Sequence, residues 1–306
     1  MAIIVNTNLT ALKTQKNLTT ATAGMNKALN RMSTGFKINS AKDDAAGLYV
    51  ATGLDTQIRG SKVAKDNVAT GTNVLQTIES DLDNILTNVQ RIRDLAVQAA
   101  NSIYGDKELA AMKAEVNERI AEIERISKAS NFNGLKLLDG TGKLKTDGLR
   151  LQVGANADKG GNCIELDKSF FEKVDCTTLG KGTTKFNANA DTSVFKNDAT
   201  ISSTADAAFE KATAAANFIA VLDTAINTIS TKKSTLGAKM NRLESAEASL
   251  TTTIENSTAA KSTIMDADIA EESANYTKNQ ILQQTSAALL VQANALPQIA
   301  ISLVQG

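Results

Sequence analysis

The chain has 306 residues, a length typical of about two domains. Lys and Arg (33) balance Asp and Glu (33), which argues against a nucleic-acid-binding protein because such proteins carry a basic excess. His is absent, which removes the commonest general base and the commonest metal ligand. A single Pro and few aromatic residues predict long helices. We therefore expect a mainly helical protein that is not an enzyme and needs neither a cofactor nor a metal.

The N-terminal flank predicts helices. No charged side chain precedes Lys13, and the residues at 40–43 (Ser-Ala-Lys-Asp) fit a capping box, with Asp44 in the first turn. A long helix is expected to begin there and to run to about residue 100. Its apolar residues step by four and three, as in a coiled coil: Ile78, Leu82, Ile85, Val89, Ile92, Ala96 and Ala99. A second helix is expected after a turn at Gly105, with Asp106 placed to cap it.

The middle of the chain predicts turns and strands. Half of the 18 glycines lie within residues 134–182. Residues 149–153 and 163–166 alternate apolar and polar side chains around a Gly-rich segment, which predicts a β-hairpin. Residues 177–205 are rich in Thr, Ser, Asn and Lys and predict an exposed loop. Cys163 and Cys176 both lie in this region, and the sequence is compatible with a disulfide between them or with two free thiols.

The C-terminal flank is helical again and ends without charge, because no charged side chain follows Lys278. One stripe of this segment consists of Leu282, Leu289, Ala293, Leu296 and Leu303, and another face carries the neutral amides Gln280, Gln284, Asn294, Gln298 and Gln305. The amides argue against a transmembrane span, and a helix lying on a membrane would carry Lys or Arg. We expect this helix to pack against copies of itself or a partner, with its amide face on a water-filled space.

Four acidic residues just before this segment suggest a cation site at first sight: Asp266, Asp268, Glu271 and Glu272. They lack the spacing and the Gly of a calcium-binding loop. We interpret them as acidic residues at the start of a helix, where the helix dipole favours negative charge.

These segments resemble the bacterial flagellins, the subunits of the flagellar filament. The resemblance rests on LNRMSTGFKINSAKDDAAGL at 29–48, QRIRDLAVQAAN at 90–101, FNGLKLL at 132–138, LQVGAN at 151–156, LGAKMNRL at 236–243, IMDADIAE at 264–271 and QANALPQ at 292–298. It covers roughly residues 1–166 and 205–306.

The resemblance implies a mainly α fold, in which paired N- and C-terminal segments form a long antiparallel coiled-coil-like helical bundle with a small β-hairpin region in the middle. It also implies five consecutive parts. Half of an inner core domain with its spoke is expected at 1–47, and the first part of an outer helical domain with the hairpin at 48–176. A short variable exposed segment is expected at 177–204. The second part of the outer domain is expected at 205–261, and the other spoke and core half at 262–306.

The implied function is a structural subunit that polymerises with copies of itself into the filament for swimming motility. No signal peptide is recognisable, and the resemblance implies export in unfolded form through the flagellar type III apparatus to an extracellular filament. Implied partners are an export chaperone at the C-terminal helix, the filament cap and the hook–filament junction proteins. Nucleic-acid binding and membrane insertion are not expected. A hook–filament junction protein of the same axial family is the alternative.

The family segment that Toll-like receptor 5 recognises maps onto residues 90–98 of this chain. The resemblance therefore implies a combined subunit interface and receptor-recognition surface, with Asp94 standing where the family usually has Glu. Its residues are Gln90, Arg91, Arg93, Leu95, Val97, Gln98 and Glu115.

Overall fold

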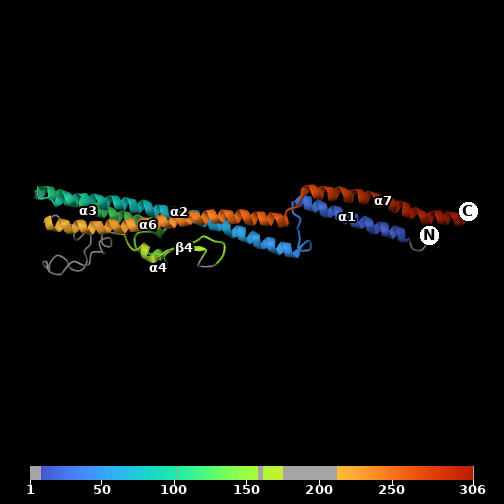
Figure 1. Cartoon of the computed structure of the whole chain (residues 1–306), viewed down its shortest axis with the longest axis horizontal. Helices are drawn as coiled ribbons and strands as arrows, with labels where there is room; N and C mark the ends of the chain where they lie inside the picture. Colours follow the sequence, from blue (N-terminus) through green and yellow to red (C-terminus); the bar gives the residue numbers. More distant parts are fainter. Residues whose placement is uncertain (1–7, 102, 158–160, 175–211, 306) are drawn as a thin grey trace. The chain divides into compact units, whose positions relative to one another are not determined.

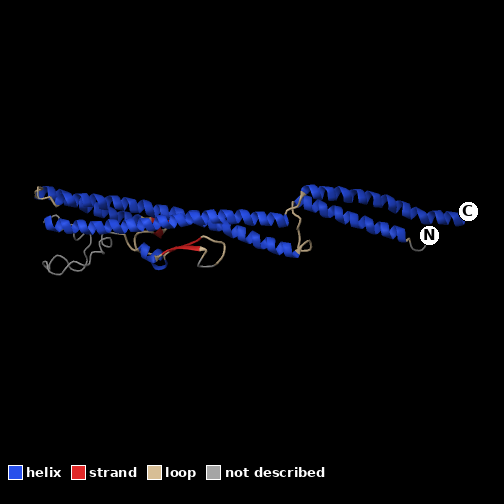
Figure 2. Ribbon diagram, viewed as in Figure 1, coloured by secondary structure: helices blue, strands red, loops and turns tan. Residues whose placement is uncertain are grey.

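A computed structural model of the chain describes residues 8–101, 103–157, 161–174 and 212–305, with side chains except at 212–217 and 296–305. The long helices are α1 (Leu9–Thr34), α2 (Ala45–Ala99), α3 (Asp106–Ala129), α6 (Ala212–Met265) and α7 (Ile269–Gln305) (Figure 1). Between α3 and α6 lie α4 (Lys143–Asp147), the 3-10 helix η1 (Lys168–Phe171), and the strands β1 (Asn131–Phe132), β2 (Leu135–Lys136), β3 (Leu149–Gln152) and β4 (Cys163–Leu166) (Figure 2). The predicted fold class, long paired helices with a small β-hairpin region in the middle, is confirmed.

The chain divides into two compact units. One unit comprises residues 1–58 and 254–306, and the other comprises residues 59–253. The divisions fall inside α2 and α6, about ten residues away from the domain bounds expected at 47 and 262. The variable segment expected at 177–204 lies outside the described residues.

The predicted start of the second helix is wrong by a few residues. Helix α2 begins at Ala45, and Asp44 caps it, because its carboxylate accepts a hydrogen bond from the backbone N–H of Gly47 at 2.9 Å. Ser40 does not take part in a capping box, since its hydroxyl donates to the Asp43 carboxylate at 3.0 Å. The predicted extent to about residue 100 is confirmed, and at about 1.5 Å per residue the helix is about 80 Å long.

The predicted cap of the third helix is also corrected. Gly105 occupies the N-cap position without a side-chain hydrogen bond, and Asp106 is the first helical residue. Asp106 and Glu108 both lie in the first turn, where they interact favourably with the helix dipole. The predicted cap position therefore lies one residue too late in the chain.

The unit of residues 59–253 is built around one apolar core. Every residue of the predicted 4-3 seam in α2 is buried in it, together with apolar residues of α3 and α6 such as Ile123, Leu222 and Leu236. Each fully buried Leu or Ile side chain contributes roughly 1.5–3 kcal/mol relative to an exposed one. The seam prediction is confirmed, and the core rests on it.

The middle segment forms two antiparallel hairpins. The predicted hairpin is confirmed, with Leu149 opposite Leu166 and Gln152 opposite Cys163. A smaller pair, β1–β2, turns through Asn133 and Gly134, whose positive φ values of 47° and 80° fit a two-residue hairpin turn.

Helices α1 and α7 pair in the unit of residues 1–58 and 254–306 (Figure 1). Helix α1 ends at Gly35, whose φ of 74° suits a residue without a Cβ. The break after α1 is tied to the break before α7, because Lys37 N–H donates to Met265 O at 2.6 Å and Ala267 N–H donates to Gly35 O at 2.9 Å. The connection after α1 and the connection before α7 thus hold each other in place.

Candidate assembly and recognition surfaces

The seam between α1 and α7 is lined by small residues. At Gly24 the helices approach so closely that a Cβ atom would lie 2.7 Å from Oδ1 of Asn279. Among the described residues of the two helices, the buried ones are Ala21, Ala28, Glu272, Ser286 and Ala293. None of these is a large apolar residue, and Leu18, Met25, Met32 and Leu290 are only half-buried, so the hydrophobic gain from pairing α1 with α7 is limited.

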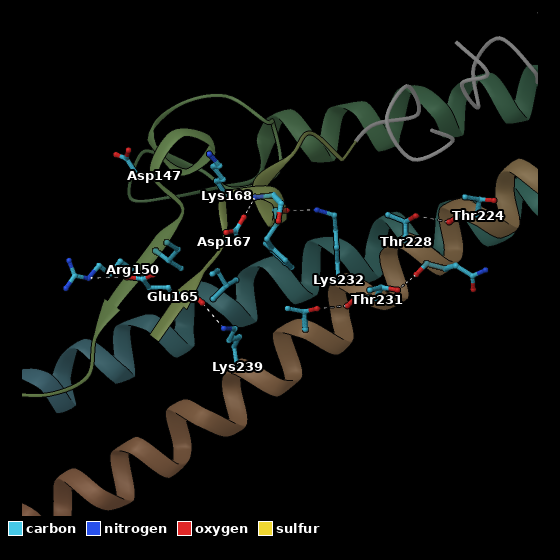
Figure 3. A pocket seen from close by; sticks show the side chains of 16 residues that line it. Asp147, Arg150, Glu165, Asp167, Lys168, Thr224, Thr228, Thr231, Lys232 and Lys239 are labelled. Carbon is cyan, nitrogen blue, oxygen red and sulfur yellow. Dashed lines mark hydrogen bonds and ion pairs between the residues drawn. The ribbon is translucent and has the colours of Figure 1, made fainter. Parts of the chain in front are cut away.

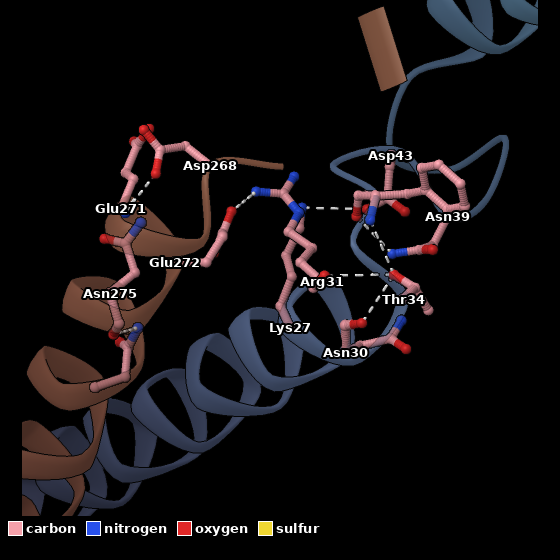
Figure 4. Close-up of polar contacts among 12 residues, drawn as sticks. Lys27, Asn30, Arg31, Thr34, Asn39, Asp43, Asp268, Glu271, Glu272 and Asn275 are labelled. Carbon is pink, nitrogen blue, oxygen red and sulfur yellow. Dashed lines mark hydrogen bonds and ion pairs between the residues drawn. The ribbon is translucent and has the colours of Figure 1, made fainter. Parts of the chain in front are cut away.

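Polar contacts fix how the two helices are aligned. Asn8 Nδ2 donates to Ala293 O at 2.7 Å near one end of the pair. At the other end, Arg31 Nη1 donates to Glu272 Oε1 at 2.7 Å, and Figure 4 shows this ion pair crossing between the helices. Both partners are largely shielded from solvent, and a nearly buried ion pair contributes more to alignment than to stability. The sequence analysis did not identify Arg31, because a lone Arg in a helix is ordinarily a surface residue.

Several large apolar side chains of this helix pair are exposed. On α1 they are Leu9, Leu12 and Leu29, and on α7, besides Ile269 in its first turn, they are Ile281, Leu282, Leu289 and Val291. Leu282 is 45% exposed and Leu289 is 56% exposed. Several large exposed apolar side chains on one helix pair indicate a surface that interacts with another molecule. We call the seven residues other than Ile269 the outer apolar set.

The predicted core-helix residues separate into two groups. Leu282 and Leu289 belong to the outer apolar set, whereas Ala293 is buried against α1 within the same chain. Of Leu296 and Leu303 only the backbone is described, and it is helical.

The predicted amide face is only partly described. Gln284 and Asn294 are exposed, and Gln280 is half-buried. The side chains of Gln298 and Gln305 lie outside the described residues.

Of the four predicted acidic residues, Asp268 caps α7, whereas Asp266 directly follows α6 and accepts a hydrogen bond from the Ser262 hydroxyl at 2.5 Å. The Asp268 carboxylate accepts hydrogen bonds from the backbone N–H of Ala270 at 2.8 Å and of Glu271 at 3.3 Å. Glu271 and Glu272 follow in the first turn, and Figure 4 shows Asp268, Glu271 and Glu272 at this end of α7. Within the part of the chain that the structure describes, no group of three or more acidic, Cys or His residues is arranged to hold a metal ion.

One residue of the predicted recognition surface, Leu95, is not exposed. Leu95 is 2% exposed and belongs to the core, so its side chain is not on the surface. Gln90, Arg91 and Gln98 are exposed, as is Val97 at 47%. The burial of Leu95 follows from its place beside Ile92 and Ala96 in the 4-3 pattern of α2. The family resemblance alone had suggested a surface position for it.

Arg91 and Glu115 form a bidentate ion pair between α2 and α3. Arg91 donates to the two carboxylate oxygens of Glu115 at 2.9 and 3.2 Å. This hydrogen bond lowers the pKa of Glu115 and raises that of Arg91, each by favouring the charged form. Arg93 pairs instead with Asp223 of α6 at 2.6 Å. The charged residues of the predicted surface thus also join the helices to one another.

Cys163 lies in β4 and forms no disulfide with any described residue. It is buried, and its S–H donates to Gln152 Oε1 at 2.9 Å while the Arg150 guanidinium donates to its sulfur at 3.0 and 3.2 Å. Cys176, its partner in the candidate disulfide, lies outside the described residues, so that pairing stays a prediction.

Among the described helices, none combines the length with the apolar character that crossing a membrane requires.

Comparison with known proteins agrees with this architecture. The family model for the bacterial flagellin N-terminal helical region matches residues 5–143, and that for the C-terminal helical region matches residues 219–304. The flagellin of Bacillus subtilis is 36% identical over 98% of this chain and 99% of its own length. A flagellar filament 33 kDa core protein of Treponema phagedenis is 35% identical over 99% of this chain and its own full length.

A solved structure shares the fold. The structure of a putative flagellar hook-associated protein from Vibrio parahaemolyticus has a TM-score of 0.54 at 15% identity, covering 72% of this chain and 99% of that one. At that identity the likeness concerns the fold alone. The two family matches and the full-length relatives show that this chain belongs to the family of bacterial flagellins.

Proposed function

We propose that this chain is the structural subunit of a flagellar filament and that α1 and α7 drive its polymerisation. The observation that carries the proposal is the outer apolar set, which surrounds a seam of small and polar residues. Covering the exposed part of one such side chain contributes roughly 1–2 kcal/mol. The helix pair gains most of its apolar burial when further copies cover it, because no other described apolar cluster lies within it.

The same surface supports the other parts of the proposal. An exposed apolar stripe on α7 would aggregate before export, so an export chaperone that covers this helix is expected. Export in unfolded form fits a helix pair that owes little stability to its own seam. The subunit then folds as it joins the extracellular filament. The filament cap lies at one end of that filament, and the hook–filament junction proteins lie at the other.

We also propose recognition of the unassembled subunit by Toll-like receptor 5. The exposed residues of the predicted surface, Gln90, Arg91, Val97 and Gln98, support it, together with the half-buried Glu115 that pairs with Arg91. Binding of depolymerised protein to the receptor ectodomain would test this. The expected result is loss of binding on Arg91→Ala, and equal binding by this variant and the parent protein would contradict the proposal.

Seeded assembly tests the main proposal. Purified full-length monomer is added to short filament fragments at neutral pH, and elongation is followed by negative-stain electron microscopy. Three variants run in parallel: a chain ending at Lys278, the double variant Leu282→Gln/Leu289→Gln, and the matched control Leu282→Met/Leu289→Met.

We expect elongation by the full chain and the Met control, and none by the truncated chain or the Gln variant. The Met control changes the shape of the two side chains but keeps their apolar area. A defect seen only in the Gln variant is therefore due to the loss of apolar burial. Elongation by the truncated chain would refute the role of α7. Failure of the full chain on filament seeds would favour the hook–filament junction protein, which joins a short ring of copies.

A further inference from the structure

Strand β4 and the 3-10 helix η1 are tied to α6 by two lysines (Figure 3). The Nζ atom of Lys232 donates a hydrogen bond to the Phe170 carbonyl oxygen and lies 4.8 Å from the centroid of the Phe170 ring. Lys239 donates to the Glu165 carbonyl oxygen at 2.7 Å. These four residues line a cleft of about 870 Å³ between α6 and the segment from α4 to η1. The larger hairpin region is thus held against its neighbouring helix.

The β1–β2 hairpin, in contrast, is held only at its base. There the Leu137 N–H donates to Ser130 O at 3.2 Å, and Lys136 Nζ donates to Lys128 O at 2.6 Å. Among the described residues, those at 132–135 make no hydrogen bond to another element. Most of the hairpin is exposed, and each of its strands has two residues. Two-stranded hairpins of this size are only marginally stable, so the tip can open while the core stays folded.

Asn133 and Gly134, the two residues of this tip, are both exposed. Within the described part of the chain, neither the side-chain amide of Asn133 nor the N–H of Gly134 makes a hydrogen bond. Apart from its chain neighbours, no atom lies within 4 Å of the position that a Cβ atom on Gly134 would occupy. Because Gly has no Cβ, its backbone nitrogen is unhindered toward the side chain of the preceding residue. An amide carbon and a nitrogen that can attack it thus lie next to each other, both open to solvent.

We propose that Asn133 is a modification site, at which the side chain deamidates and the backbone of the turn is rearranged. Hydroxide removes the proton of the Gly134 N–H, the nitrogen attacks Cγ of Asn133, and the side-chain nitrogen leaves as ammonia. The five-membered imide that results adds one water and opens to aspartate or isoaspartate. One Asn and one water yield one acidic residue and one ammonia, without oxidant or reductant. The proposal stands independently of the filament role.

The turn has to open before the imide can form. The φ values of Asn133 and Gly134, 47° and 80°, fit a two-residue hairpin turn. Ring closure requires the amide carbon of Asn133 to approach the Gly134 nitrogen, so the backbone between them has to rotate out of this turn. Opening costs little at a tip that is anchored only at its base, and the reaction therefore proceeds from the opened hairpin.

Isoaspartate changes the hairpin in two ways. It carries the chain through its side-chain carbon, and the additional backbone atom does not fit a two-residue turn that pairs Asn131 with Lys136 and Phe132 with Leu135. Phe132 packs against the core of its unit, and loss of the pairing releases it. The new carboxylate also adds a negative charge to residues 131–136, which contain no acidic residue.

Incubation of the full-length protein at neutral and at alkaline pH tests the proposal. Peptide mass spectrometry follows deamidation, and electron-transfer fragmentation distinguishes isoaspartate from aspartate. The same chain in guanidinium chloride gives the rate for a turn without constraint. Asn39 is the internal control, because it is also exposed but precedes Ser40, and its side-chain amide donates to Phe36 O at 2.9 Å. The matched variant Asn133→Gly cannot deamidate, and Gly-Gly suits the same turn.

We expect Asn133 to deamidate faster than Asn39, and faster at alkaline pH. The rate in the folded protein should lie within about tenfold of that in guanidinium chloride, which corresponds to an opening free energy below about 1.4 kcal/mol. A slower rate than this would show that the turn protects Asn133 and would overturn the proposal, as would equal rates at Asn133 and Asn39. Incubation should lower the thermal midpoint of the parent protein but not that of Asn133→Gly, and equal losses would contradict the effect on the hairpin.

Discussion

At the scale of single residues, two ion pairs of α1 illustrate how burial changes the role of a charge. Arg31 meets Glu272 at 2.7 Å in the nearly buried seam, whereas Lys27 meets Asp43 at 3.2 Å with the Lys side chain largely exposed. The Nε atom of Arg31 is buried without a hydrogen-bond partner. Loss of Glu272 would leave a shielded guanidinium with even fewer partners, a costly state, while loss of Lys27 costs little because water replaces it.

We predict that Glu272→Gln weakens assembly far more than Lys27→Gln does. Breaking a nearly buried pair costs on the order of 3 kcal/mol, which corresponds to about a hundredfold rise in the monomer concentration at equilibrium with filaments. Lys27→Gln should change this concentration by less than about threefold. Sedimentation of assembled filaments measures both. Similar values for the two variants would contradict the assignment of Arg31 and Glu272 to the seam.

A pH dependence is expected from Glu115. Its pKa is lowered, chiefly by the hydrogen bond from Arg91, so the folded protein favours the carboxylate. The resulting stabilisation is present above the ordinary pKa of 4.5 and is lost as the pH falls below it. Glu115→Gln should therefore lower the thermal midpoint slightly at pH 7 and leave it unchanged near pH 3. Circular dichroism checks this, and an equal loss at both pH values would argue against the ion pair.

At the scale of elements, α2 packs into the core of its unit with one face. The 4-3 seam enters the core, and neighbouring positions on the same stretch face solvent. Leu95 and Val97 are only two positions apart, which places them about 200° apart around the helix. Their side chains are accordingly 2% and 47% exposed.

We predict that Leu95→Ala destabilises the bundle and that Val97→Ala does not. Removing a buried Leu side chain costs about 2–5 kcal/mol, through lost burial and the cavity left behind. An exposed substitution stays within about 0.5 kcal/mol. Urea unfolding of the monomer, followed by circular dichroism, gives both values. Equal midpoints for the two variants would show that residue 95 does not lie in the core.

At the scale of the whole molecule, the two compact units bury different kinds of side chain. The unit of residues 59–253 encloses Leu, Ile, Val and Phe, whereas α1 and α7 bury mainly Ala and Ser in their seam. The unit of residues 59–253 has a core that can make it stable in the monomer. In the proposed filament, the α1–α7 pair would gain from further copies the apolar burial that it lacks alone.

The absence of charged side chains from α7 after Lys278 leads to a prediction about filament growth. We expect the amide face to line the channel through which unfolded subunits travel, where neutral side chains present no electrostatic trap. Gln284→Lys should then shorten filaments in growing cells, and Gln284→Ala, which adds no charge, should not. Electron microscopy of filament length measures this. Equal lengths for the two variants would refute a channel position for Gln284.

The sequence by itself determined the helical class, the apolar seam of α2, the hairpin and the uncharged end of α7. These are set by local periodicity, which depends on each element alone. The turn of β1–β2 also depends on local sequence alone, since Asn133-Gly134 is a strong hairpin signal. In the sequence these two residues served only as part of the FNGLKLL motif.

Only the tertiary structure decided which element meets which. The ion pair of Arg31 with Glu272 joins residues 241 positions apart, and the cleft around Lys232 requires η1 to pack on α6. The burial of Ala293 depends likewise on α1 lying beside α7. Such contacts depend on how the folded chain brings distant faces together, and no local pattern of charge or hydrophobicity encodes that pairing.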